Sequence, residues 1–290
     1  GIEYAGNAFE GWQTQPHGRT VQDFLERALA QIAQEPVKLV CAGRTDTGVH
    51  ASMQVAHFDT TARRPLEAWV RGVNSHLPDS VSVLWAVEVG DDFHARFSAE
   101  ARRYRYVLIN RRVRPGLACG RVGWTHGELD EGVMAEAAAC LVGEHDFTSF
   151  RAAECQARSP VRLMHSVSVQ RRGDVVLFDF HANAFLHHMI RNLVGSLVFV
   201  GKGRRPVGWM AELLALQEQI SAEQMQLHRG ETFKCFVSGK GKLGDNYVAA
   251  RTDGNLIIEF EGDDSLIGSF QNVKVIEPLT YVLRGELERN

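Results

Sequence analysis

The chain contains few cysteines, and their placement excludes several kinds of site. Among its 290 residues the cysteines are scattered, odd in number and never spaced as C-x-x-C: Cys41, Cys119, Cys140, Cys155 and Cys235. This pattern argues against a disulfide framework or a zinc ribbon, and it favours a reducing compartment. The three closely spaced cysteines that bind many iron–sulfur clusters are missing as well.

Long apolar stretches are also missing. No run approaches the roughly 18 apolar residues that a membrane-spanning helix needs. The first residues, GIEYAG, lack the basic region and apolar core of a secretory signal. A hydrophobic fraction of 44% and a charged fraction of 23% are ordinary for a globular protein. We therefore expect a cytoplasmic protein, with two domains of roughly 150 residues each.

Charge is spread unevenly along the chain, although the net charge is only −3. Residues 96–114 hold a single acid, Glu100, and these arginines: Arg96, Arg102, Arg103, Arg105, Arg111, Arg112 and Arg114. Tyr104 and Tyr106 lie among them. Clustered guanidinium groups attract phosphates, and interleaved aromatic rings stack on bases. The segment is thus a candidate RNA contact; a solvated strand-and-turn face is the alternative.

Helix and strand patterns alternate along the first two thirds of the chain. Thr20 is a candidate N-cap for a helix whose apolar residues recur at helical spacing from Val21 to Ile32. Residues 102–110 alternate in the manner of a strand, and residues 184–200 form a largely apolar helix. Strands alternating with helices, with hairpins between them, indicate an α+β fold whose mixed sheet is mostly antiparallel.

The pattern changes after Leu214. A polar helical connector is followed by five short strand-like pieces with turn residues between them: 231–241, 246–253, 255–262, 268–279 and 280–288. Short strands at this spacing predict a small β-barrel. The expected organisation is therefore two halves of an α+β unit, a connector and a barrel, bounded as 1–95, 96–215, 216–229 and 230–290.

Five segments, in order, resemble the tRNA pseudouridine synthase A family over residues 1 to about 215. They are EYAGNAFEGWQTQPHGRTVQDFLERAL, CAGRTDTGVHA, DDFHARFSAEARRYRYVLIN, GEHDFTSFR and NAFLHHMIRNLVGSL. The resemblance implies an isomerase that converts uridine to pseudouridine at positions 38, 39 and 40 of the tRNA anticodon arm. It also implies no cofactor, no metal and a homodimer.

The last 70 or so residues resemble a different protein, the TRAM domain that ends MiaB-type tRNA methylthiotransferases. TRAM is a small β-barrel implicated in RNA binding. In the synthase family the chain after ELL continues into a final strand of the catalytic sheet, and here that strand is replaced by the connector. The alternative to an active isomerase is therefore a non-catalytic tRNA- or RNA-binding protein, a fusion or chimera with an incomplete sheet. Because clustered cysteines are lacking, methylthiotransferase activity is not expected.

Exchanging the bond between ribose C1′ and uracil N1 for one between C1′ and uracil C5 needs an ionised carboxylate, a cation near it, and a ring against the extruded base. By resemblance Asp46 is the nucleophile, Tyr104 stacks on the base, and Arg191 pairs with the carboxylate. Gly43 and Gly48 permit close approach of the backbone to a ribose. The alternatives are a turn aspartate, a core tyrosine and a surface arginine. Attack at C6, attack at C1′ and proton removal from C2′ all stay open.

The predicted helix 184–200 places His187 and His188 on the face of Arg191. Because adjacent helical residues point about 100° apart, this pair does not predict a metal site on the helix. Candidate RNA contacts are Arg44, Arg96, Arg102, Arg103 and Arg105.

The tripeptide Arg-Thr-Asp of residues 44–46 recurs at 251–253. Asp253 precedes Gly254 between two strand-like pieces, which predicts a hairpin turn rather than a second reactive carboxylate.

Overall fold

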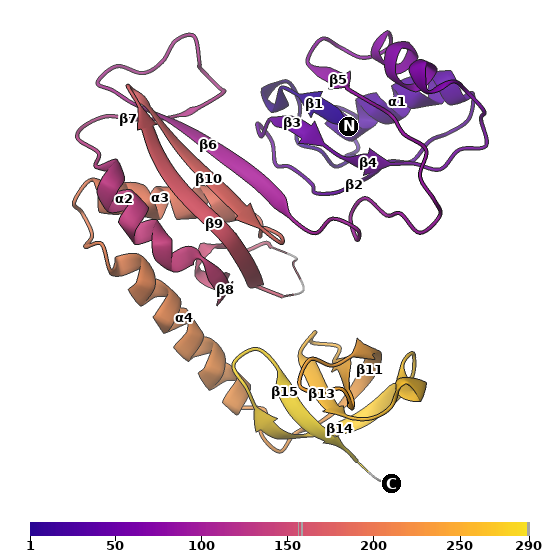
Figure 1. The fold of residues 1–290 in the computed structure, drawn as a ribbon, viewed down its shortest axis with the longest axis vertical. Helices are drawn as coiled ribbons and strands as arrows, with labels where there is room; N and C mark the ends of the chain where they lie inside the picture. Colours follow the sequence, from indigo (N-terminus) through magenta and orange to yellow (C-terminus); the bar gives the residue numbers. More distant parts are fainter. Residues whose placement is uncertain (156, 158, 289–290) are drawn as a thin grey trace. The chain divides into compact units, whose positions relative to one another are not determined.

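A computed structural model of the chain describes residues 1–155, 157 and 159–288, and it divides into two compact units (Figure 1). The first unit comprises Gly1–Ala101 and Arg111–Thr125, and the second comprises Arg102–Asn110 and His126–Asn290. The last two positions of the predicted barrel range lie outside the described residues. No helix within the described residues is long and apolar enough to cross a membrane.

The first unit is built on short antiparallel strands. Strand β1 (Ile2–Tyr4) lies between β3 (Ala51–Gln54) and β5 (Val81–Val83). Strand β2 (Val40–Cys41) pairs with β4 (Ala56–His57). The other elements are η1 (Gly6–Ala8), η2 (Ala68–Gly72) and β7 (Gly123–Thr125).

The apolar stretch at residues 81–89 is a strand only at its beginning. Val83 pairs with Ile2 of β1, and β5 ends at Val83. Beyond it Leu84, Trp85 and Val87 are exposed. The apolar run is therefore longer than the strand that it contains.

Helix α1 (Val21–Ala33) confirms the helix expected after Thr20. The Thr20 hydroxyl accepts a hydrogen bond from the Asp23 N–H at 3.3 Å, and the Thr20 N–H donates to the Asp23 carboxylate at 3.1 Å. This reciprocal capping box satisfies two backbone donors that the helix itself cannot use. The helix buries an apolar stripe that includes Val21, Leu25 and Leu29.

A larger antiparallel sheet forms the centre of the second unit. Its five strands lie in the order β7, β6 (Arg102–Asn110), β10 (Val175–Ala182), β9 (Val161–Arg172) and β8 (Gly143–Asp146), and β7 is the edge strand hydrogen-bonded to β6. Helices α2 (Glu131–Ala138) and α3 (Met189–Gly201) cover one face (Figure 1). Two single turns, η3 (Ala139–Leu141) and η4 (Thr148–Phe150), flank β8.

The alternation predicted for residues 102–110 is confirmed. Tyr104 and Tyr106 lie opposite the buried Phe180 and Phe178 of β10. Both tyrosines therefore belong to the face of the sheet that carries the apolar core. Arg103 and Arg105 belong to the opposite face, because side chains alternate along a strand.

The prediction of a helix over residues 184–200 is wrong at its beginning, because α3 starts at Met189. His188 has a φ of 60°, in the left-handed region. A residue with this backbone cannot belong to a right-handed helix. Residues 184–188 are therefore a turn leading into the helix, although their apolar pattern continues that of the helix.

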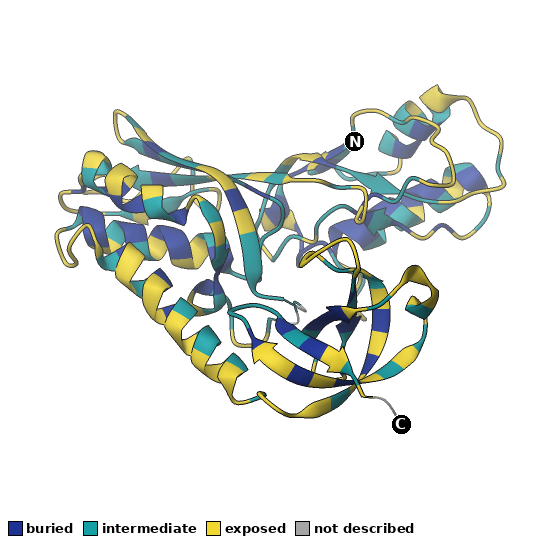
Figure 2. Cartoon of the chain, turned by 60° about the horizontal axis from the view of Figure 1, so that its bottom comes forward, coloured by how far each residue is buried: buried dark blue, intermediate teal, exposed yellow. Residues whose placement is uncertain are grey.

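The predicted C-terminal barrel is confirmed. After helix α4 (Trp209–Gln226), which extends the expected connector towards the N-terminus, five strands close in the order β11-β12-β13-β15-β14. Their bounds are β11 Thr232–Lys240, β12 Tyr247–Arg251, β13 Ile257–Glu261, β14 Phe270–Pro278 and β15 Leu283–Leu287, with the turn η5 at Asp264–Leu266. Buried and exposed residues alternate along the strands, and α4 is largely exposed (Figure 2).

Closure of the barrel leaves the larger sheet with an unextended edge. Strand β8 is the last strand on its side, and within the described residues no barrel strand pairs with it. The barrel strands therefore form a sheet separate from the one that ends at β8.

The turn predicted at Asp253 is confirmed, but the residue with a left-handed backbone is Asn255. The Thr252 N–H donates to the Leu256 carbonyl at 3.1 Å, which encloses a three-residue loop. Asn255, rather than Gly254, has a positive φ of 65°. A three-residue hairpin loop needs its left-handed residue last, and Asn tolerates that conformation.

We predict that Thr20→Ala lowers the free energy of unfolding of the first unit by about 1 kcal/mol, because the N-cap acceptor is lost. Urea titration followed by tryptophan fluorescence measures the change. Thr47→Ala, which alters an exposed loop threonine, is the control. Equal stability of the two variants would show that the capping box contributes nothing.

Candidate functional site

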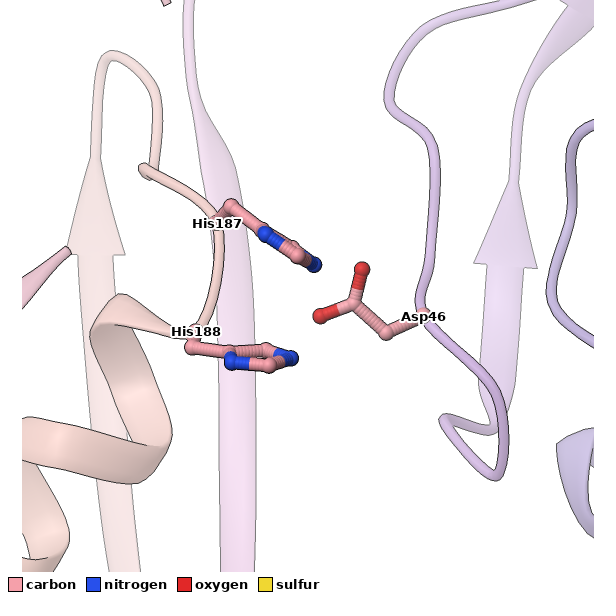
Figure 3. Close-up of side chains that lie close together, drawn as sticks. All are labelled: Asp46, His187 and His188. Atoms are coloured by element: carbon pink, nitrogen blue, oxygen red, sulfur yellow. The ribbon is translucent and has the colours of Figure 1, made fainter. Parts of the chain in front are cut away.

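Asp46 lies on the loop that joins β2 to β3, residues 42–50 (Figure 3). The residue before it, Thr45, is held from two sides. Its hydroxyl shares a 2.7 Å hydrogen bond with the Tyr4 hydroxyl, and its carbonyl accepts the Trp12 N–H at 3.0 Å. Tyr4 and Trp12 are both almost fully buried. The backbone that carries the Asp46 side chain is therefore anchored to the core of the first unit.

The two ends of the same loop are fixed by further contacts. At the start, the Gln54 side-chain amide donates to the Gly43 carbonyl at 2.6 Å. At the end, the Gly6 N–H donates to His50 Nδ1 at 3.1 Å. A Cβ on Gly6 would collide with the Val49 carbonyl, so only glycine permits this approach. Neither Gln54 nor Gly6 was recognisable from sequence spacing, because both lie outside the loop they hold.

The bond from Gly6 also decides the tautomer of His50. Since Nδ1 accepts the hydrogen bond from the Gly6 N–H, Nε2 carries the ring hydrogen of the neutral imidazole. His50 Nε2 is buried and has no hydrogen-bond partner within the part of the chain that the structure describes. His50 therefore serves as a neutral acceptor that holds the loop against η1.

Gly48 has a backbone conformation that favours glycine. Its φ is 83°, and no atom lies within 4 Å of where a Cβ would stand. The chain thus turns sharply two residues after Asp46, and the space next to Gly48 stays open. Gly43 does not have a positive φ, and its contribution is the carbonyl that Gln54 binds.

Positive charge acts on the base of the loop. Burial raises the pKa of the Cys41 thiol to about 11, while the guanidinium groups of Arg44 and Arg96 oppose that increase. The thiol therefore stays protonated near neutral pH and is a poor nucleophile. Both arginines are exposed, so their charges are available at the surface of the first unit.

Tyr104 is half-buried on β6, in the second unit. Its ring meets that of Phe185 edge to face, with centroids 5.0 Å apart and an angle of 78° between the planes. This contact restricts the ring and leaves part of it uncovered. Phe185 was not singled out from sequence, because it lay inside what looked like a helix.

The three β6 arginines predicted to bind RNA differ in their surroundings. Arg105 makes a two-pronged ion pair with Asp179, at 2.7 and 3.1 Å. Arg102 donates to the Asn183 carbonyl at 2.6 Å. Arg103 is exposed and lies directly opposite His181 of β10. Arg102 and Arg105 thus have structural contacts within the second unit, and Arg103 is exposed.

Arg191 lies in the first turn of α3 and is exposed. It lines a hollow of about 450 Å³ in the second unit, together with residues of η4 and of the start of α4. Within the second unit, the described residues form no hydrogen bond or ion pair with the Arg191 guanidinium.

His187 and His188 do not share a helical face with Arg191, contrary to expectation. Both precede α3, and their ring centroids are only 4.0 Å apart, with 33° between the planes (Figure 3). The left-handed backbone of His188 brings the rings together. Adjacent residues of a helix point about 100° apart, but His187 and His188 are not in a helix. The argument made from that angle against a metal site therefore does not apply to them.

Comparison with known proteins identifies the same family that the sequence motifs resemble. A model of the tRNA pseudouridine synthase family matches residues 2–98 and 137–235. The second range extends beyond residue 215, where the family resemblance was expected to end, into β11. The chain belongs to the tRNA pseudouridine synthase family, whose members are isomerases.

Individual relatives narrow the class. The chain is 66% identical over 222 residues to the tRNA pseudouridine synthase A of Aromatoleum aromaticum, covering 77% of this chain and 84% of the relative. It is 59% identical over 219 residues to the tRNA pseudouridine synthase A of Dechloromonas aromatica, covering 76% and 84%. It is 58% identical over 222 residues to the tRNA pseudouridine synthase A of Thiobacillus denitrificans, and the match covers 77% of this chain and 85% of the relative.

We predict that Arg103→Gln raises the pKa of His181. Partial burial, the Arg103 charge and His165 all lower that pKa, and removing a cation makes the protonated imidazole easier to form. NMR titration of the His181 ring proton measures the shift. Arg172→Gln, at the opposite end of the same sheet, is the control and leaves the titration unchanged. An identical titration curve for wild type and Arg103→Gln would contradict the prediction.

Proposed function

We propose that the chain isomerises uridine to pseudouridine in the anticodon stem-loop of tRNA, at positions 38 to 40, with Asp46 as the nucleophile. The observation that carries this proposal is the anchored loop 42–50, in a chain that belongs to the tRNA pseudouridine synthase family. A nucleophile must be held in place before it reacts, and loop 42–50 has contacts to the core on both sides of Asp46.

The reaction breaks the bond between C1′ and N1, turns the uracil, and joins C1′ to C5. Asp46 can form a covalent bond to C6 or C1′, or remove the C2′ proton. In each route the proton displaced from C5 must leave, and Tyr104 is placed by this proposal as the ring beneath the base and as a proton carrier. The protein keeps the detached uracil from diffusing away.

Arg191 is proposed to pair with the Asp46 carboxylate, which keeps it ionised. Its exposure and the lack of a neutralising partner among the described residues of its own unit support this role. The other proposed RNA contacts are Arg44, Arg96, Arg102, Arg103 and Arg105. Arg103 and Arg44 can meet phosphates directly because both are exposed, whereas Arg105 must exchange Asp179 for a phosphate.

We further propose a cytoplasmic homodimer whose C-terminal barrel is a TRAM-type domain that contacts RNA. The strand order, with β13 parallel to β15 and every other pair antiparallel, supports an OB-like barrel. OB-like barrels bind nucleic acids in several other proteins.

A second function, RNA binding without catalysis, is favoured by one observation. Within the described residues nothing extends the sheet beyond β8, so the final strand of the family's catalytic sheet has no substitute. A missing strand removes apolar packing and exposes an edge. The two functions differ in turnover alone, and one experiment separates them.

The test is release of tritium from tRNA labelled at C5 of uridine. We predict release by the wild-type chain and a decrease on the order of 10⁴-fold or more in Asp46→Asn, because an amide cannot act as the nucleophile. Asp253→Asn is the matched control, since it alters the aspartate of the second Arg-Thr-Asp copy in the β12–β13 turn. That variant keeps wild-type activity.

Binding of tRNA without release at any protein concentration would instead establish the non-catalytic function. A loss in Asp253→Asn equal to that in Asp46→Asn would refute the assignment of Asp46.

A further inference from the structure

The hollow beside Arg191 has an unusual lining for an open surface feature. Its walls come from η4, from α3 and from the segment that starts α4. Two arginines line it, Arg191 and Arg205, with the aromatic rings of Phe199 and Trp209. Serine hydroxyls from η4 and α3 complete the polar part. Within the described residues no Asp or Glu lines the hollow, so its charge is positive and uncompensated.

The aromatic and cationic groups are arranged in pairs. The Arg205 guanidinium lies over the Trp209 ring, 5.2 Å from its centroid. A planar cation beside an indole face offers a donor for phosphate and a stacking surface for a base at adjacent points. The neighbouring Arg204 instead lies over Phe199, at 5.6 Å, and does not line the hollow.

The floor of the hollow is open because of Gly195. No atom lies within 4 Å of where a Cβ at this position would stand. Glycine in a helix interior costs about 1 kcal/mol relative to alanine, so α3 is less stable than it could be at this point. Any longer side chain here would project into the hollow. The Asn192 side-chain amide, which donates to the Phe150 carbonyl at 2.9 Å, fixes one wall against η4.

We propose that this hollow binds one nucleotide of the tRNA substrate, with the phosphate at Arg205 and Arg191 and the base against Trp209. A volume of about 450 Å³ lies within the range of small-ligand sites. The assignment of the ligand to tRNA rests on the proposed function. A guanidinium has five N–H donors, so Arg191 can contact both a phosphate and the Asp46 carboxylate.

The experiment measures tRNA binding in the full chain carrying Asp46→Asn, so that turnover does not disturb the equilibrium. We predict that Arg205→Gln raises the Kd for tRNA by about tenfold, which is the loss of one charged phosphate contact. The slope of log Kobs against log salt concentration falls by about 0.7 to 0.9. Arg204→Gln, the matched control, changes Kd by less than about twofold, the effect of an exposed charge without a direct contact.

Gly195 provides a second pair of variants. Gly195→Gln fills the hollow and weakens tRNA binding, whereas Gly195→Ala retains it and stabilises α3. Thermal unfolding of both variants checks that the helix is intact. The proposal is overturned if Gly195→Gln binds tRNA as tightly as Gly195→Ala, or if Arg204→Gln and Arg205→Gln weaken binding equally.

A free nucleotide has the same chemistry as one in tRNA, and competition distinguishes the two sources. Uridine monophosphate below about 1 mM is expected not to displace tRNA, because a single nucleotide makes few contacts. Displacement that disappears in Arg205→Gln would assign the hollow to a free nucleotide and overturn the tRNA assignment.

Failure of the proposed function gives a different result. Wild type would release no tritium, while Arg205→Gln would still weaken tRNA binding and the hollow would stand as an RNA site. Asp46-dependent release together with unchanged binding in Arg205→Gln and Gly195→Gln would overturn the inference alone.

Discussion

The paired hydrogen bonds on Thr45 are the constraint on which the candidate chemistry depends. One comes from the buried Tyr4 hydroxyl of β1 and the other from the Trp12 backbone N–H. Because Tyr4 and Trp12 belong to the apolar core of the first unit, the loop gains the rigidity of that core without being part of it.

Much of this arrangement could be predicted from the sequence where local chemistry decides the outcome. The capping residues of α1, the alternation along β6 and the turn-separated strands of the barrel are local patterns, and the structure has them as expected. The loop of Asp46 was recognisable because its residue types are unusual over ten positions. Each of these features is decided by residues that lie within a few positions of it in the sequence.

The remaining features depend on partners far away in the chain. Helix α3 starts late because His188 takes a left-handed backbone, although histidine has no strong preference for it. Gly6 and Gln54 hold the loop from outside, and Phe185 restricts Tyr104 from a turn. The hollow at Gly195 likewise exists only once three separate elements meet.

The path of the chain through its two units has a further consequence. The backbone enters the second unit at Arg102, returns to the first at Arg111 and leaves it again after Thr125. The units are thus joined by three covalent connections, and β6 is an insertion of one unit's sheet within the other's sequence. Neither unit corresponds to a continuous gene fragment, so shuffling by simple end-to-end joining can exchange the barrel but cannot exchange the two halves of the synthase.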